Sequence, residues 1–311
     1  MRIAILGAGS LGSLYAALLS QVEGVELFIH GRGSHGAHMA AHGLQLEGLD
    51  THFLSNQDVF FSLEEVGLPP HVFGTIDFAL LTGKAGQTTY LAQLAHKLLN
   101  DEGMALCLSN GLGHAEQCVE TLGPHRVFAA SSTHGAWRPS PGVVHWAGKG
   151  ETVLGSLTGG PGELEAKPLL EAFSVAGLEP SWSSDGLATL WKKVLLNIAI
   201  NPIAALAGVE NGTLLRPELF SSAFSTLLEG AAVARMERVV IPDDAELEQQ
   251  LRQVITATST NICSMLQDIR AGRITEISVL NQAIVLRGER AGIATPLNQM
   301  LVAMVNALHS E

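Results

Sequence analysis

The chain has 311 residues, which favours two domains over one, and its 47% hydrophobic content suits packed cores and excludes an intrinsically disordered chain. The formal net charge of −12 argues against a nucleic-acid-binding surface. The longest apolar runs are interrupted by Gly, Lys or Asn before the roughly 18 residues of a membrane span, so we expect no membrane segment. Three scattered cysteines are typical of reduced thiols in a cytoplasmic protein, which is the location we expect.

Short apolar runs alternate with helical stretches over the first half of the chain. Strands are predicted at residues 2–6, 25–30, 77–81, 104–109 and 126–132, and helices at residues 11–21, 87–99 and 114–122. Because strand–helix alternation is typical of βαβ units, the pattern predicts an α/β domain with a parallel sheet.

The pattern changes from about residue 134, where alternating residues and turn signals predict antiparallel strands, followed by one helix and a short strand at 178–183. After Asp185 only helical spacing remains, and Pro202 is expected to kink or end the first helix. Helices are predicted at residues 187–208, 216–239, 243–270, 276–292 and 296–308. We therefore predict an α/β domain over residues 1–184 and an all-helical domain over residues 185–311.

A glycine-rich loop, "GAGSLG", follows the first predicted strand and opens the first helix. It comprises Gly7, Ala8, Gly9, Ser10, Leu11 and Gly12. The first glycine permits a tight turn, the second lets backbone amides approach a pyrophosphate, and the third allows close helix–strand packing. In a βαβ frame this loop predicts a dinucleotide site, whereas a glycine-rich turn without a ligand is the alternative.

The end of the second strand indicates which dinucleotide binds. An NAD site places a carboxylate there to hold the ribose hydroxyls, but the strand ends "IHGRGS", which supplies Arg32 instead. A guanidinium can hold a 2′-phosphate through paired hydrogen bonds. Lys84 follows another strand at the edge where ligands of open sheets bind. We interpret both as contacts to NADP(H) phosphates, with solvated surface cations as the alternative.

Asn110, in "SNGLG" after the next strand, could contact the nicotinamide ribose or the substrate. Gly111 would relax the backbone beside it, and an ordinary Asn-Gly turn is the alternative.

A polar stripe runs along the apolar segment "LWKKVLLNIAINP". Lys193, Asn197 and Asn201 are spaced four residues apart, so they share one slanted face of a helix. A lysine and two amides suit a pocket for a small anionic or carbonyl substrate, in which the ammonium would protonate an oxygen as hydride reaches carbon. Snorkelling of the lysine and amide bonds to the backbone are the alternative, and Lys192 is the natural solvated lysine.

A second polar set occurs in "CSMLQDIRAGRITEIS". Ser264 and Asp268 are four residues apart on one predicted helix, which Gly272 is expected to end. Thr275 would cap the next helix and place Glu276 in its first turn, where a carboxylate is stabilised, so a solvated capping role is also open.

The sequence resembles the ketopantoate reductases (2-dehydropantoate 2-reductases) nearly from end to end. The resemblance rests on seven blocks in the family's order: "GAGSLG", "LTGKAGQT", "LSNGLG", "STHGAWRPSPGVVHWAG", "LWKKVLLNIAINP", "SMLQDIRAGRITEI" and "ERAGIATPLNQML". It implies an N-terminal Rossmann-type domain, a helical C-terminal domain and a site in the cleft between them. It also implies NADPH-dependent reduction of the 2-keto group of ketopantoate to pantoate, toward pantothenate and coenzyme A.

The resemblance assigns roles residue by residue. It makes Lys193 the catalytic lysine and Glu276 the essential glutamate, with Asn197 and Asn201 as substrate asparagines and Ser264 as the carboxylate-binding serine. Further matches are Asn110 to the family's "NG" asparagine, Lys84 to its cofactor lysine, Arg32 to its phosphate-binding arginine and Asp268 to a supporting acidic position. The chain departs from the family at Ser278, Gln282 and Gly83, which leaves the substrate side chain open.

Other functions remain open beside this one. The same scaffold could reduce another branched 2-keto acid, or the chain could be an NADP-sensing regulator without catalysis. His35, His38 and His42 could share a helix face that suits a transition metal, but no carboxylate or fourth ligand lies nearby in sequence, so we expect a solvated helix and no metal. We expect a small 2-keto acid as partner, neither nucleic acid nor membrane, and a homodimer as one assembly to test.

Overall fold

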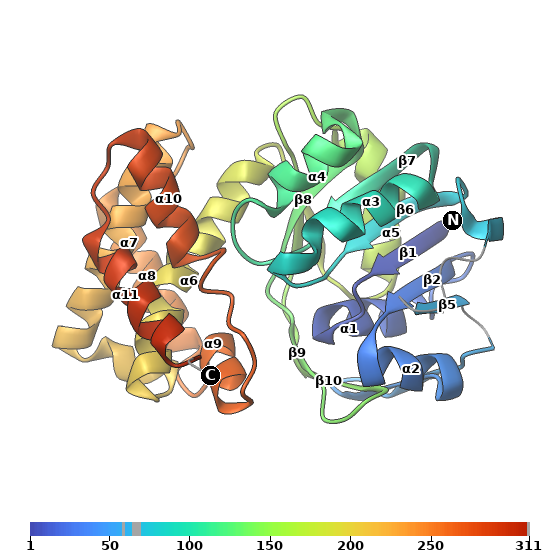
Figure 1. The fold of residues 1–311 in the computed structure, drawn as a ribbon, viewed down its shortest axis with the longest axis horizontal. Coiled ribbons are helices and arrows are strands. Elements are labelled where there is room, and N and C mark those ends of the chain that lie inside the picture. The colour runs from blue at the N-terminus through green and yellow to red at the C-terminus, as the bar shows by residue number, and fades with distance from the viewer. Residues whose placement is uncertain (58–59, 64–69, 310–311) are drawn as a thin grey trace. The chain divides into compact units, whose positions relative to one another are not determined.

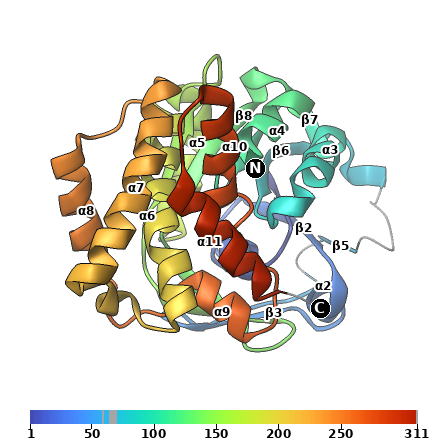
Figure 2. The ribbon, with the colours of Figure 1, turned by 60° about the vertical axis from the view of Figure 1, so that its left-hand side comes forward.

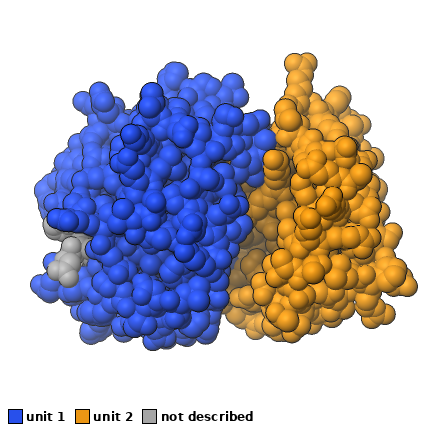
Figure 3. Space-filling view, turned by 180° about the vertical axis from the view of Figure 1, so that it is seen from behind, with its two compact units in different colours: residues 1–109, 114–189 blue, residues 110–113, 190–311 orange. Residues whose placement is uncertain are grey.

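The computed structural model describes residues 1–57, 60–63 and 70–309, and its contacts divide the chain into two compact units. Unit 1 comprises residues 1–109 and 114–189, and unit 2 comprises residues 110–113 and 190–311 (Figure 3). The division falls after Thr189, where the sequence placed it after residue 184, and the loop Asn110–Gly113 belongs to the helical unit.

Unit 1 is built on a mixed eight-stranded sheet in the order β12-β11-β8-β7-β6-β1-β2-β5. Figure 1 shows the part of this sheet from β7 through β6, β1 and β2 to β5. Its strands are β1 (Arg2–Leu6), β2 (Glu26–Gly31), β5 (Phe60–Leu63), β6 (Ile76–Leu81), β7 (Leu99–Cys107), β8 (Val127–Ser132), β11 (Thr152–Ser156) and β12 (Pro180–Ser183). The six strands from β5 to β8 pair in parallel, whereas β11 runs antiparallel to β8. This order confirms the predicted Rossmann-type sheet. Successive strands are added on one side of β1 as far as β5, and from β6 they are added on its other side.

The helices of unit 1 are α1 (Ser10–Leu19), α2 (Gly33–His42), α3 (Thr88–Leu98), α4 (His114–Leu122) and α5 (Glu163–Val175). A smaller sheet, in the order β4-β3-β10-β9, consists of β3 (Leu44–Gly48), β4 (His52–Leu54), β9 (Gly135–Trp137) and β10 (Val143–Gly148). Helix α1 contacts both sheets, which explains why it is apolar on nearly every side: it is buried from Gly12 to Leu19.

Unit 2 is helical, as predicted. Its helices are α6 (Gly186–Ala207, which starts in unit 1), α7 (Pro217–Met236), α8 (Asp244–Ala257), α9 (Ser264–Arg270), α10 (Asn281–Ala291) and α11 (Pro296–Ala307) (Figures 1 and 2). Short 3-10 turns occur at η1 (Pro70–Val72), η2 (Ala85–Gln87), η3 (Pro124–Arg126) and η4 (Asn211–Leu215).

Two predicted helices in the helical half were wrong. The predicted helix 243–270 is two helices, because the segment between them bonds to η4 through Asn211 N–Asn261 O and Gly212 N–Ser259 O. The predicted helix 276–292 starts only at Asn281. The predicted helix 187–208 is confirmed as α6, which continues through Pro202 to Ala207, so of the two predicted effects of Pro202 an end of the helix does not occur.

Helix α6 is long and apolar enough, by length and composition, to cross a membrane, which the interrupted apolar runs did not predict. It is the one such helix among the described residues, and 61% of its most apolar window is buried inside the protein. Trp191, Ile198 and Ala199 are fully buried, so packing within the protein accounts for its apolar character.

Candidate active site

The glycine loop leaves β1 through a backbone that only glycine can adopt without strain. Gly7 has φ +91°, and a Cβ there would lie 2.7 Å from the Gly83 backbone. A Cβ on Gly12 would lie 2.4 Å from the Thr82 hydroxyl. The loop is thus pressed against the end of β6, and side chains at these two positions would fill the space it leaves.

The loop leads directly into α1, whose N-cap is Gly9 and carries no side-chain cap. The N-terminus of a helix presents unsatisfied backbone N–H groups and a partial positive charge. With no side chain from Gly9 in the way, a pyrophosphate can approach these groups. The loop residues therefore fit a dinucleotide phosphate.

The two predicted phosphate contacts lie on either side of this loop. Arg32 follows β2 and Lys84 follows β6, and these strands flank β1 in the sheet. Both side chains are exposed. Gln87 faces the guanidinium, and with its amide oxygen turned toward Arg32 it accepts from Nε at 3.0 Å. Unit 1 thus gathers the loop and both cations at the carboxyl edge of three adjacent strands, where ligands of such sheets bind.

Unit 2 joins three predicted site residues in one hydrogen-bonded chain. The Lys193 ammonium donates to Asn110 Oδ1 at 2.7 Å, and Asn110 Nδ2 donates to Glu276 Oε2 at 3.1 Å. Asn110 thus spans a cation and an anion, which fixes which end of its amide faces each. We call Lys193, Asn110 and Glu276 the polar relay.

The loop that carries Asn110 reaches this position because of Gly111. Its φ is +97°, and a Cβ there would lie 2.5 Å from the Val279 carbonyl oxygen. The next residue, Leu112, donates its N–H to that same oxygen at 2.9 Å. The loop is therefore hydrogen-bonded to the turn that contains Glu276. A residue with a side chain at position 111 would prevent this close approach.

Burial lowers the pKa of Lys193 to about 8, against the Glu276 carboxylate, which raises it. Its neighbour Lys192 is exposed, as predicted for the solvated lysine. An ammonium that loses its proton near neutral pH is suited to donate one to a substrate.

The other predicted site residues of unit 2 are the two asparagines of the α6 stripe and the pair Ser264 and Asp268, and they differ from one another in burial. Asn197 is half-buried, and Asn201 is 8% exposed. The Cys263 thiol donates to the Asn201 carbonyl oxygen at 3.4 Å, which fastens the start of α9 to α6. Ser264, the first residue of α9, is exposed, and Asp268 is buried and accepts from Arg273 Nε at 2.7 Å.

The predicted place of Glu276 in the first turn of a helix was wrong. Glu276 lies in a turn that precedes α10, and its carbonyl oxygen accepts from Val279 and Leu280 N–H groups. Gly272 ends α9 with φ +63°, as predicted. The carboxylate is therefore placed by the turn and by Asn110.

The histidine set on α2 is engaged by the protein itself. His35 is buried, accepts from Gly142 N at 3.0 Å through Nδ1, and contacts Ser13 Oγ at 2.9 Å through Nε2. Burial lowers the pKa of His35 to about 4, so it is neutral at pH 7. The rings of His38 and His42, both exposed residues of α2, are tilted against each other with centroids 4.8 Å apart, and the described residues hold no group of three metal ligands.

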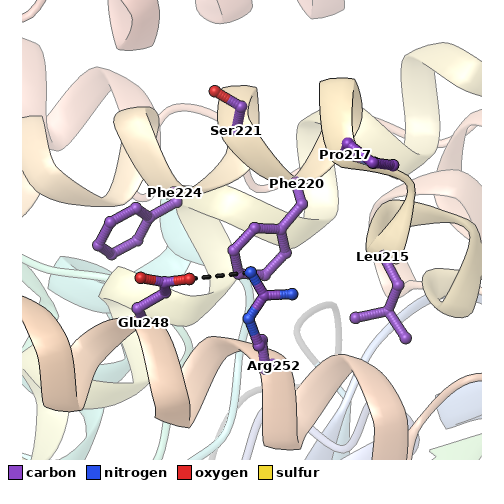
Figure 4. Close-up of a pocket in the computed structure, with 7 residues that line it drawn as sticks. All are labelled: Leu215, Pro217, Phe220, Ser221, Phe224, Glu248 and Arg252. Atoms are coloured by element: carbon purple, nitrogen blue, oxygen red, sulfur yellow. Dashed lines mark hydrogen bonds and ion pairs between the residues drawn. The ribbon is translucent and has the colours of Figure 1, made fainter.

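A surface pocket in unit 2 involves none of the predicted site residues (Figure 4). It is lined by Leu215, Pro217, Phe220, Ser221, Phe224, Glu248 and Arg252. The Arg252 guanidinium lies 3.8 Å from the Phe220 ring centroid and pairs with Glu248 at 2.9 Å. Its one cation is already neutralised by that pairing, so the pocket offers little to an anionic substrate.

Two contacts were not anticipated from the sequence. Asn110 was expected to contact ribose or substrate, whereas the structure also bonds it to Lys193 and Glu276. These partners are 83 and 166 residues away in sequence, so local spacing does not reveal the contacts. Gln87 was not singled out, although it lies three residues after Lys84 in the same block. For Gln87 this spacing was a usable signal, since one turn after a strand end brings a side chain back to the same edge.

Comparison with known proteins gives one consistent result. Residues 3–159 match the family model described as "Ketopantoate reductase PanE/ApbA", and residues 185–309 match "Ketopantoate reductase PanE/ApbA C terminal". A 2-dehydropantoate 2-reductase of Pyrococcus horikoshii is 34% identical, with 100% of this chain and 98% of the relative covered. One from Vibrio cholerae is 31% identical, with 99% and 98% covered.

Solved structures with the same fold include a ketopantoate reductase and a D-mandelate dehydrogenase. A PanE/ApbA family ketopantoate reductase from Ralstonia eutropha JMP134 is 30% identical, with a TM-score of 0.84 and 99% of this chain and 98% of that chain covered. A ternary structure of D-mandelate dehydrogenase with NADH and anilino(oxo)acetate is 26% identical, with a TM-score of 0.88 and 99% and 98% covered.

Proposed function

The chain belongs to the ketopantoate reductase family, and on that premise we propose that it is an NADPH-dependent oxidoreductase that reduces the 2-keto group of ketopantoate to pantoate. This reaction is a step toward pantothenate and coenzyme A. The polar relay is the observation that carries the proposal, because it holds an ammonium of lowered pKa beside a carboxylate and an amide.

NADP(H) fits the residues at the edge of the unit 1 sheet, and when bound it supplies the hydride. The glycine loop and the N-terminus of α1 would hold the pyrophosphate. Arg32 would bind the 2′-phosphate through its guanidinium, and Lys84 would add a second positive charge at the same edge. We propose unit 1 as the cofactor domain and unit 2 as the substrate domain.

Lys193 is the proposed general acid. Its ammonium donates a hydrogen bond to the C2 oxygen and transfers a proton to it as hydride adds to the C2 carbon, so the keto group becomes a hydroxyl and the lysine a neutral amine. Solvent returns the proton to the amine. Asn110 orients Nζ, and the Glu276 carboxylate favours the charged form that starts the step.

The other polar residues of unit 2 are proposed to hold the substrate. Asn197 and Asn201 share the face of α6 that carries Lys193 and would bind the hydroxyl or keto oxygen. Ser264 is an exposed residue, and its hydroxyl would bind the carboxylate. Orientation and charge stabilisation by such groups supply much of the rate of an enzyme of this kind.

A second substrate class has its own observation. The D-mandelate dehydrogenase structure, with a 2-oxo acid analogue bound, is as similar in fold as the ketopantoate reductases. Of the positions where the chain departs from the family, Ser278 lies in the turn that follows Glu276, and Gln282 is the second residue of α10. Reduction of a 2-keto acid with another branched or aromatic side chain is therefore the second candidate.

NADPH oxidation measured against a panel of 2-keto acids distinguishes the two candidates. We expect ketopantoate to give the highest kcat/KM, with straight-chain 2-keto acids slower because they fill less of the substrate site. A branched or aromatic 2-keto acid with a higher kcat/KM than ketopantoate would favour the second candidate. Absence of turnover with every acid would favour the NADP-sensing alternative.

A further inference from the structure

Helix α6 contains a backbone carbonyl that lacks its usual donor one turn later in the helix. Proline has no N–H group, so Pro202 cannot donate to the carbonyl oxygen of Ile198 one turn earlier. Ile198 is fully buried, and a buried carbonyl without a donor is costly. This carbonyl lies between Asn197 and Asn201 on the helix that carries Lys193.

The missing donor comes from α10. Asn281 Nδ2 donates to the Ile198 oxygen at 3.1 Å and to Asn298 Oδ1 at 3.0 Å, and the Asn281 residue is fully buried. Asn281 is the first residue of α10, directly after the turn of Glu276. Gln282 N bonds back to the Ile277 oxygen at 3.0 Å, so the start of α10 and that turn form one hydrogen-bonded piece.

The orientation of the Asn281 amide is fixed from the far side. Asn298 Nδ2 donates to the Thr226 oxygen at 3.1 Å and to Glu229 Oε2 at 2.8 Å, which leaves only its oxygen to face Asn281. The Glu229 carboxylate also accepts the backbone N–H groups of Leu297 and Asn298. A reversed Asn281 amide would set its oxygen against two acceptors, so the network specifies one arrangement.

We propose that Asn281 is a positioning residue of the reductase reaction. By donating to the Ile198 carbonyl oxygen, which Pro202 leaves without its usual donor, it holds the Glu276 turn at a fixed place along α6. The inference rests on the proposed function. Asn281 touches no reacting atom. It acts by keeping Glu276 within reach of Asn110, and so keeps Lys193 aimed.

The test compares Asn281→Ala, Pro202→Ala and the double variant. In Asn281→Ala we expect kcat to fall by about ten- to a hundredfold, as a small misplacement can cause. The KM for NADPH should be little changed, because the residues proposed to hold the cofactor phosphates lie in unit 1. Glu276 is the charged group that raises the pKa of Lys193, so a displaced Glu276 also moves the alkaline limb of kcat/KM to lower pH. Glu276→Gln removes the carboxylate charge altogether, so its shift of the alkaline limb is the largest that displacement of Glu276 can cause.

Pro202→Ala distinguishes two effects of the Asn281 side chain: positioning of the Glu276 turn, and donation of a hydrogen bond to the Ile198 carbonyl oxygen. This substitution supplies a backbone N–H that can donate to the Ile198 oxygen, so the double variant should regain thermal stability relative to Asn281→Ala. It should not regain kcat or the wild-type pH profile, since the link between α6 and α10 is still absent. Pro202→Ala alone is the reference for both comparisons. Ile284→Ala, a buried truncation on the same helix, should lower thermal stability and leave the pH profile in place.

Two results would overturn the inference. One is an Asn281→Ala enzyme that loses only thermal stability, and the other is recovery of kcat by Pro202→Ala in the double variant. If the wild type reduces no 2-keto acid, the proposed function fails by itself. The titration of Lys193, followed by NMR in lysine-labelled protein, then decides on Asn281: a lower pKa in Asn281→Ala supports positioning, and an unchanged one contradicts it.

Discussion

Lys193→Ala is expected to lower kcat for 2-keto-acid reduction by about a hundred- to ten-thousandfold, the range that a general acid contributes. The physical reason is that alanine offers neither a proton nor a positive charge to the oxygen that becomes a hydroxyl. NADPH binding should be little changed, because the residues proposed to hold the cofactor phosphates lie in unit 1. The measurements are steady-state NADPH oxidation and a fluorescence titration with NADPH.

Lys192→Ala is the matched control for this prediction. It removes the same side chain one position away, but Lys192 is exposed on α6, so turnover should stay near that of the wild type. Near-normal turnover in Lys193→Ala, or equal losses in both variants, would remove Lys193 from the role of general acid.

Arg32→Ala is expected to raise the KM for NADPH by about ten- to a hundredfold, since a charge-assisted hydrogen bond contributes roughly 1.5–3 kcal/mol. The KM for NADH should change little, because NADH has no 2′-phosphate for the guanidinium to bind. The ratio of kcat/KM values for the two cofactors is the quantity to measure.

Arg32→Lys provides the control for charge. It keeps the positive charge but loses the planar pair of donors, so its KM for NADPH should lie between those of the wild type and Arg32→Ala. Equal effects of Arg32→Ala on both cofactors would mean that the residue does not contact the 2′-phosphate.

Local sequence pattern was sufficient for much of the fold. The strands at residues 2–6 and 77–81 and the helix at 114–122 agree with the structure to within a residue, because their apolar spacing is regular. The start of α10 was missed because residues 276–280 also suit a helix, and the hydrogen bonds that make them a turn depend on the folded protein. The break between α8 and α9 likewise depends on bonds to η4, a segment distant in sequence.

The candidate site likewise contains residues that local spacing predicted and a contact that only the folded protein shows. Lys193, Asn197 and Asn201 were found from spacing on one helix, which a sequence displays directly. The bridge through Asn110 was not found, because it depends on a tertiary contact between the loop at Gly111 and the turn at Val279. The assigned roles, the homodimer and the cytoplasmic location stay predictions.

The alkaline limb of kcat/KM tests the central claim most directly, since that claim is proton donation by a partly buried ammonium. With the pKa of Lys193 lowered to about 8, the wild type should be fully active below that pH and lose activity about tenfold per pH unit above it. Lys193→Arg, whose side chain stays protonated, should show low activity without this limb. A wild-type profile that stays flat to about pH 10, near the ordinary lysine value, would contradict the account.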